Sequence, residues 1–338
     1  MTVSSTKVWL GRFLALGLIL GLASAANAAP PERLLPDNTT MVFSVNIKSL
    51  VDSPLYQKAL KEKLEELMKK NKEFTGIMQT MNFDPMKDLT SFTAAIGNFN
   101  VNMQGGPPKP DVEPVLILKG NFDVQKIETA LSALISAGGK DKVAIAKLGS
   151  RTLFELKEGE KPMFGTFIDK ETVALCDSKD NLQVVIDKAE GKKTTKLTKE
   201  FQAALSKADT KRTIWGAMIM PDTIKQLASM APQGAIMEKI ESMNFAVNVK
   251  DNIEIELNAY AADADSATEF KKLLDQGKEI MGIAALQAPD EQDSKDISDF
   301  ISSLRISNNQ KMVSMKGELK GGLIERAVKK AASRGDGE

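Results

Sequence analysis

Histidine is missing from this chain, and cysteine occurs only once in its 338 residues. The lack of histidine excludes Ser-His and Cys-His nucleophilic machinery, the usual zinc ligand sets and the commonest general base near neutral pH. A single cysteine excludes intramolecular disulfides, CxxC redox pairs and iron–sulfur sites. That residue, Cys176, ends the apolar run Val173–Cys176. This setting favours a small buried hydrophobic residue over a reactive or intermolecular thiol.

Nucleotide-binding signatures and an excess of charge are missing as well. The sequence contains neither GxxxxGK[ST] nor GxGxxG. Its 45 basic residues balance 45 acidic ones. Removal of residues 1–28 takes away Lys7 and Arg12, so the balance becomes 43 − 45 = −2. This charge gives no electrostatic reason to bind nucleic acid or an anionic membrane, and we expect no nucleic-acid partner.

The first 28 residues have the pattern of a secretory signal peptide. Lys7 and Arg12 precede the short apolar stretch 13–22, and Ala26-Asn27-Ala28 forms a cleavage site. The apolar stretch is too short to span a bilayer, and no later stretch approaches about 18 apolar residues in a row. The sequence therefore predicts export to the periplasm or the extracellular space, with no integral membrane span after cleavage.

Alternating apolar residues predict strands with one buried face. Met41, Phe43, Val45 and Ile47 form one such run. The clearest is 245–259, where two alternating runs on either side of Asp251-Asn252 predict a hairpin with a two-residue turn and one wet face. Further strands are predicted at 90–96, 114–119, 143–148, 152–156, 163–168, 173–176 and 213–220, with a last hairpin around Asn308-Asn309. Residues 105–110, rich in glycine and proline, are predicted as a loop.

Capping residues mark the helices. Ser53-Pro54 starts a helix over 54–70, Asp123 one that ends at Gly138-Gly139, Asp180 one closed by Gly191, and Asp265 one that reaches 286. Shorter helices are expected at 222–230, 294–303 and 321–332. Helices interleaved with hairpins predict an α+β fold, with an antiparallel sheet and helices packed on one face.

The order of elements occurs twice. We therefore predict two similar units at 29–207 and 208–332, followed by a disordered tail at 333–338. The alternative is that the repeated order arose by coincidence, since few identical residues align between the two halves.

The remaining candidate sites have simpler structural explanations. Asp263-Ala264-Asp265 has calcium-loop spacing, but turn and helix-cap chemistry explains it better. Asp290, Glu291, Asp293 and Asp296 could hold a hard cation, or stabilise the start of the following helix. A methionine-rich set suggests either core packing or an adaptable apolar binding surface: Met78, Met81, Met86, Met218, Met220, Met230, Met237 and Met243. We assign no catalytic, cofactor-binding or metal-binding residue and expect no cofactor.

Several segments resemble a family of exported bacterial proteins of unknown function. They are Leu34-Leu35-Pro36-Asp37, Ser53-Pro54-Leu55 and Phe83-Asp84-Pro85-Met86-Lys87-Asp88-Leu89, joined by the "LKGNFD" stretch at 118–123 and the 261–274 segment. The resemblance implies an exported protein and transfers no catalytic residue.

Together these patterns favour a non-enzymatic envelope protein with a binding or scaffold role, whose partner is an envelope protein or an apolar ligand. If the helices cover only part of the apolar side of the hairpins, the remaining surface is the natural binding site. One alternative is a carboxylate-only hydrolase acting on an envelope glycan, although Trp215, Tyr56 and Tyr260 are few aromatic platforms for stacking sugars. The third hypothesis is that the protein is a structural component of the envelope.

Overall fold

The computed structural model describes residues 31–70, 72–102, 109–157, 161–229, 234–285 and 291–335. The predicted signal peptide and its cleavage site therefore lie outside the described residues, as do Met230 and Asp290.

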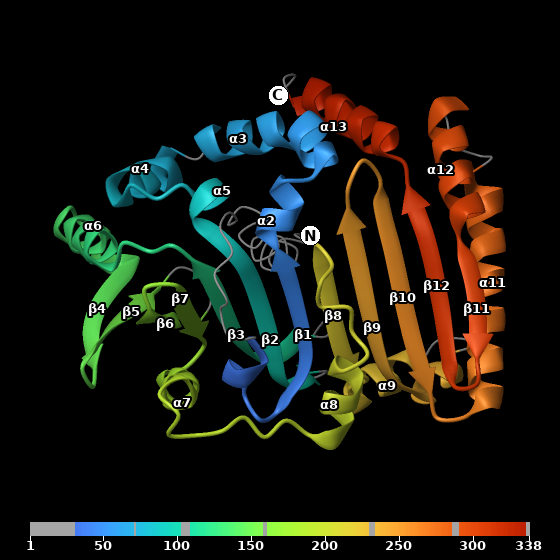
Figure 1. Cartoon of the computed structure of the whole chain (residues 1–338), viewed down its shortest axis with the longest axis horizontal. Coiled ribbons are helices and arrows are strands. Elements are labelled where there is room, and N and C mark those ends of the chain that lie inside the picture. The colour runs from blue at the N-terminus through green and yellow to red at the C-terminus, as the bar shows by residue number, and fades with distance from the viewer. Residues whose placement is uncertain are drawn as a thin grey trace.

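The strands form one antiparallel sheet with the order β11-β12-β10-β9-β8-β1-β2-β3-β7-β6-β5-β4 (Figure 1). This confirms the α+β class and the antiparallel sheet. The strands are β1 (Thr39–Asn46), β2 (Leu89–Asn102), β3 (Lys109–Gly120), β4 (Val143–Leu148), β5 (Arg151–Leu156), β6 (Met163–Asp169), β7 (Thr172–Cys176), β8 (Ile214–Ile219), β9 (Ile240–Val249), β10 (Ile253–Ala261), β11 (Arg305–Asn309) and β12 (Met312–Leu319).

The helical elements connect these strands. They are η1 (Pro31–Leu34), α2 (Ile47–Val51), the π-helix η2 (Tyr56–Leu60), α3 (Lys61–Lys70), α4 (Lys72–Met81), α5 (Pro85–Asp88), α6 (Val124–Ser136), η3 (Gly139–Asp141), α7 (Lys179–Ala189), α8 (Lys199–Leu205), α9 (Asp222–Ser229), α10 (Ala235–Glu238), α11 (Ala264–Ala285), α12 (Glu291–Ser303) and α13 (Gly321–Gly335).

The strands of both predicted units belong to this single sheet. β1 and β8, the first strand of each unit, pair antiparallel at its centre, with Phe43 opposite Gly216. The two units are thus joined by hydrogen bonds along their central strands, while the division into duplicated units stays a prediction.

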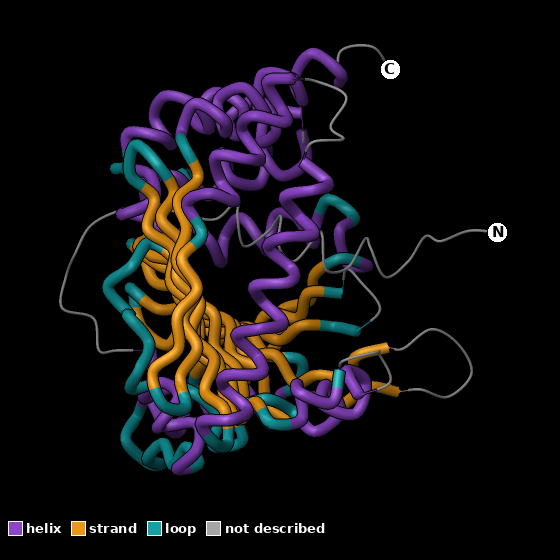
Figure 2. The backbone as a smooth tube through the Cα atoms, turned by 90° about the vertical axis from the view of Figure 1, so that its right-hand side faces the viewer, coloured by secondary structure: helices purple, strands orange, loops and turns teal. Residues whose placement is uncertain are grey.

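Helices cover both faces of the sheet, which corrects the prediction of helices on one face. We call the face that carries Trp215 the α8 face, because Phe201 of α8 and Leu182 of α7 share a buried cluster with Trp215, Val42 and other residues of that face. The opposite face, which carries Phe245, is the α11 face, because Phe270 of α11 packs there against Ala259 and Val313. Figure 2 shows the sheet edge-on with its helices.

The physical reason for two covered faces lies in the N-terminal strands. The run 115–118 in β3 is apolar at every position, so both sides of that strand must be removed from water. Val115 and Ile117 are buried in the cluster of the α8 face, whereas Leu116 and Leu118 face the other way and pack with Val45 and Phe92. In β10, by contrast, the apolar residues Ile253, Ile255 and Leu257 alternate with polar ones.

Several predicted boundaries are corrected by the hydrogen bonds. Ser178, not Asp180, caps α7 by accepting from the Asn181 amide at 3.2 Å. Asp263, not Asp265, caps α11 by accepting from the Ser266 amide at 2.7 Å. The β9–β10 turn contains three residues, 250–252, because Val249 pairs with Ile253. The last hairpin turns at Gln310-Lys311, where Gln310 takes a φ of 51°, and not at Asn308-Asn309.

The last two residues of the predicted loop, 109–110, lie in a strand. β3 begins at Lys109, so Pro110 lies in the strand, while residues 103–108 lie outside the described residues. β7 pairs with β3 only over Val115–Lys119. Among the described strands, the first half of β3 therefore pairs with β2 alone, and a proline is tolerated where an outward-facing N–H is not needed.

Candidate functional site

A row of apolar residues and glycines crosses the entire sheet on the α11 face. The cross-strand partners, from β4 to β11, are Ile145, Phe154, Gly165, Leu175, Leu116, Ala94, Phe43, Gly216, Phe245, Leu257, Met315 and Ile306. Directly paired residues on neighbouring strands point to the same face, so these side chains form one continuous band. We call this set the apolar band.

The centre of the apolar band is only half-buried. Phe43, Phe245 and Leu257 are all of intermediate exposure, and so are Val247 and Ile255 beside them. By contrast, Ala259 and Val313, which α11 covers, are about 1% exposed. The helices therefore cover only part of the apolar side of the β9–β10 hairpin, which is the condition under which the sequence predicts a binding surface.

A glycine shapes this centre. Any Cβ atom at Gly216 would overlap the ring of Phe245, because that ring lies directly over the β8 backbone. In this position Phe245 stacks on Phe43, with ring centroids 6.1 Å apart and planes at 29°. Phe43 in turn meets Phe92 edge to face at 6.5 Å. The strands of both predicted units thus share one aromatic cluster.

A pocket with a volume of about 740 Å³ lies among η2, α3, α4 and α5, close to this cluster. Its apolar walls include Val51, Met68, Met78, Phe83 and Met86. Val51 and Met86 also pack against the buried cluster that contains Val45 and Phe92 and adjoins Phe43. The pocket therefore borders the same buried cluster against which Phe43 of the apolar band packs. Its size falls within the range of roughly 300–1,000 Å³ that is usual for small-molecule sites.

A π-turn begins the wall of this pocket, where the sequence predicts a continuous α-helix over 54–70. Ser53 starts the helix as expected, because its Oγ accepts from the Tyr56 amide at 3.2 Å. The Lys61 amide then donates to the Tyr56 carbonyl, five residues back. Single π-turns are rare and are frequent at functional sites. The result places Tyr56 and Lys61 together on the pocket wall.

Tyr56 is the most buried polar group of this pocket. Its side chain is 3% exposed, and burial, together with the charges of Glu65 and Asp84, raises its pKa to about 12. The phenol is therefore a neutral hydrogen-bond donor at physiological pH. Its hydroxyl contacts the thioether sulfur of Met86 at 4.0 Å, and sulfur is only a weak acceptor.

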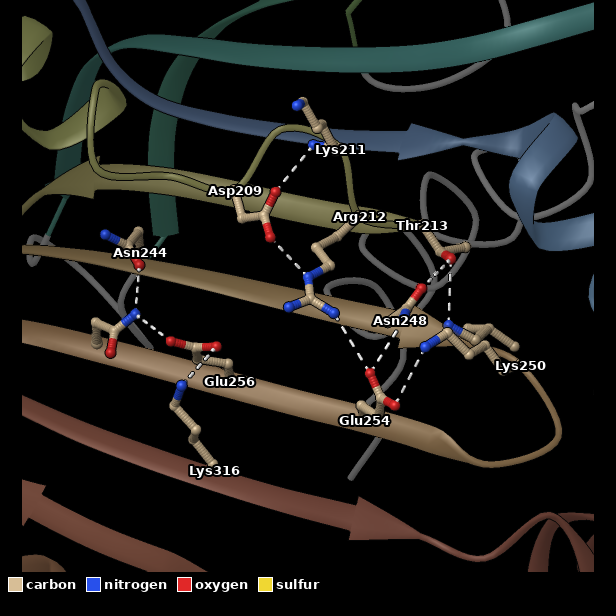
Figure 3. Close-up of polar contacts among 12 residues, drawn as sticks. Asp209, Lys211, Arg212, Thr213, Asn244, Asn248, Lys250, Glu254, Glu256 and Lys316 are labelled. Carbon is tan, nitrogen blue, oxygen red and sulfur yellow. Dashed lines mark hydrogen bonds and ion pairs between the residues drawn. The ribbon is translucent and has the colours of Figure 1, made fainter.

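The opposite, α8 face of β8–β10 carries polar side chains that satisfy one another (Figure 3). Glu254 accepts from Asn248 at 3.1 Å, Arg212 at 3.3 Å and Lys250 at 3.4 Å. The hydrogen bond from Asn248 and the neighbouring cations lower the pKa of Glu254. Alongside, Asn258 donates to Asn244 at 3.0 Å and to Glu256 at 3.2 Å. This network is the predicted wet face, although Asn244 and Asn258 are buried within it.

The acidic side chains of α12 pair with basic side chains of α13. Asp296 accepts from Arg326, and Asp293 accepts from Lys330 at 2.7 Å, so α12 is tied to α13. Glu291 and Asp293 also lie in the first turn of α12, as the helix-dipole interpretation predicts. The segment Asp263-Ala264-Asp265 provides a helix cap, as expected, although Asp263 is the capping residue. Among the described residues, no group of three or more Asp, Glu, Cys or His side chains is placed to hold a metal ion.

The methionine-rich set divides between core and pocket. Met218, Met237 and Met243 pack against the buried cluster under α11, which contains Met220. Met78 and Met86 line the pocket, and Met81 is buried. Cys176 is fully buried, as the sequence predicts. Burial and the neighbouring Asp177 raise the pKa of its thiol.

Within the described part of the chain, none of the helices has the length and apolar character that crossing a membrane requires.

Comparison with known proteins gives little support for any family. The sequence matches no family model, and no curated protein matches it. A solved structure titled "Structure of crystal form I of TP0453" is similar over 90% of this chain and 98% of that chain, with 9% identity and a TM-score of 0.43. The resemblance of segments such as Leu34-Leu35-Pro36-Asp37 to an exported family therefore stays a prediction.

Proposed function

We propose that this chain is an exported, non-enzymatic binding protein of the cell envelope that holds an apolar or amphiphilic molecule. One observation carries the proposal: a methionine-lined pocket of about 740 Å³ borders the buried cluster against which the half-buried Phe43 of the apolar band packs. Flexible, polarisable methionine side chains adapt to ligands of different shape. The predicted signal peptide supports a location in the periplasm or outside the cell.

The carboxyl groups argue against the alternative of a carboxylate-only hydrolase. A general acid in glycoside hydrolysis needs a raised pKa. In the described chain, the carboxyl groups whose pKa departs clearly from its ordinary value all shift downward, as at Glu254 and Asp296. Each of these two is held by cations or hydrogen-bond donors. They are suited to a structural role and not to proton donation.

The sheet order supports an internal duplication as the origin of this architecture. From the central β1–β8 pair the strands run outward in chain order, through β2 and β3 on one side and through β9 and β10 on the other. A long helix then follows in each half, α6 after β3 and α11 after β10. We propose that a binding surface spanning both halves arose when the two units fused along β1 and β8.

Adjacent residues of α3 provide the test. Met68 lines the pocket, whereas its neighbour Leu67 is 49% exposed and lies outside the lining. The uncharged, environment-sensitive dye N-phenyl-1-naphthylamine should bind the native protein and brighten. We expect Met68→Glu to weaken dye binding by about tenfold or more, because a carboxylate in an apolar wall is costly.

Leu67→Glu is the matched control, since it adds the same charge one residue away. It should leave dye affinity within about twofold of the wild type, as expected for a surface substitution. Equal loss of binding in both variants, or none in either, would contradict the pocket as the site.

A further inference from the structure

The pocket wall presents one hydroxyl and one ammonium group from the same π-turn. Tyr56 and Lys61 both line the pocket, and the hydrogen bond from the Lys61 amide to the Tyr56 carbonyl fixes the spacing of their backbones. The Tyr56 side chain is nearly fully buried, and among the described residues its hydroxyl has one hydrogen-bond partner, the Met86 sulfur at 4.0 Å. A donor that is buried with so weak an acceptor is suited to a ligand oxygen.

The other charged groups on this wall are already engaged. Asp84 accepts from the Met86 amide at 2.9 Å and pairs with Lys87 at 2.6 Å. Glu65 lies 4.0 Å from Lys69. By contrast, Lys61 makes no ion pair with any residue that the structure describes. The charge left available at the pocket is therefore positive.

We propose that the pocket binds a straight-chain carboxylic acid, with its carboxylate on Tyr56 and Lys61 and its alkyl chain along Met68, Met78 and Met86. This inference rests on the proposed function and specifies the ligand of that site. A neutral phenol and one ammonium match the single negative charge and the two acceptor oxygens of a carboxylate. The methionine wall and the adjoining apolar band take the chain.

Calorimetric titration of the full chain with three probes of equal chain length tests the head group. The probes are dodecanoate, 1-dodecanol and dodecyltrimethylammonium, each kept below the concentration at which it aggregates. We expect dodecanoate to bind about tenfold or more tightly than the cationic probe, because it gains a charge-assisted hydrogen bond and avoids repulsion by Lys61.

Substitutions within the chain assign the contacts. Tyr56→Phe should weaken dodecanoate binding by about tenfold and keep the ring in place. The only other tyrosine, Tyr260, bonds to Asn244 on the α8 face, so Tyr260→Phe is the matched control and should change nothing. Lys61→Met should weaken dodecanoate by up to about fivefold. Lys58→Met removes a lysine that pairs with Asp251 and does not line the pocket, and should leave the affinity unchanged.

The outcomes separate this inference from the proposed function. If all three probes bind with similar affinity, and Tyr56→Phe and Lys61→Met have no effect, carboxylate recognition is overturned while apolar ligand binding stands. Tighter binding of the cationic probe overturns it as well. If no probe binds and the neutral dye does not bind either, both the inference and the proposed function are wrong.

Discussion

Lys188 shows how a single side chain holds a distant segment of the chain. Its side chain is 1% exposed, and its Nζ donates to the Leu35 carbonyl at 2.5 Å and to Asp37 at 2.6 Å. Asp37 also accepts from the Lys196 amide at 2.9 Å. Burial would raise the pKa of Asp37, but its bonds to Lys188 and Lys196 lower it overall. The Leu34-Leu35-Pro36-Asp37 motif is thereby anchored to α7.

We predict that Lys188→Met destabilises the protein by about 2 kcal/mol, because it leaves a buried carbonyl without a donor. Urea unfolding measures this as a lower midpoint with an unchanged slope. Lys192→Met is the control, because that lysine lies at the surface beside Glu190 and should cost less than about 0.5 kcal/mol. A midpoint for Lys188→Met equal to that of the control would show that the anchor contributes nothing.

At the scale of elements, the α12–α13 contact should depend on pH. The hydrogen bond from Arg326 is the main cause of the lowered pKa of Asp296. A depressed carboxyl pKa contributes stability that is complete above the unfolded value of about 3.8 and is lost as the pH falls through the lower folded pKa. The contact is therefore intact at neutral pH and weakens only in strong acid.

Hydrogen exchange tests this contact without unfolding the whole protein. At neutral pH, Asp296→Asn should speed amide exchange in α13 and leave the central strands β1 and β8 unchanged. Ser298→Ala, on the same helix, should leave exchange in α13 as it is in the wild type. Unchanged exchange in Asp296→Asn would mean that the ion pair does not hold α13 against α12, and that apolar residues such as Ile297 and Leu323, which line the same pocket between the two helices, are sufficient.

The sequence predicts best those helix ends that depend on residues within a single turn. Asp123 caps α6, and Gly138 ends it with a φ of 102°, as the sequence predicts, because both effects act within one turn. Ser178 was missed beside Asp180 because both residue types cap helices. The local sequence does not predict α4. Its residue Met78 belongs to the methionine-rich set, but that pattern fits core packing as well as it fits a binding surface.

At the scale of the whole molecule, the sequence predicts which side chains are apolar but not what covers them. Alternation in β10 correctly places Ile255 and Leu257 on one face of the sheet and Glu254 and Glu256 on the other. The pairing of β1 with β8 joins residues far apart in the chain, and no local pattern encodes it. Partial coverage of the apolar band, and the pocket beside it, depend on that long-range assembly and emerge only in three dimensions.

Native mass spectrometry of the protein purified from its own host tests the binding function most directly. We predict that the wild type carries a noncovalent adduct with the mass of a small amphiphile, and that Met68→Glu, purified in the same way, loses it while Leu67→Glu keeps it. A wild-type protein that shows only the mass of its bare chain, or an adduct that persists in Met68→Glu, would contradict a ligand in this pocket.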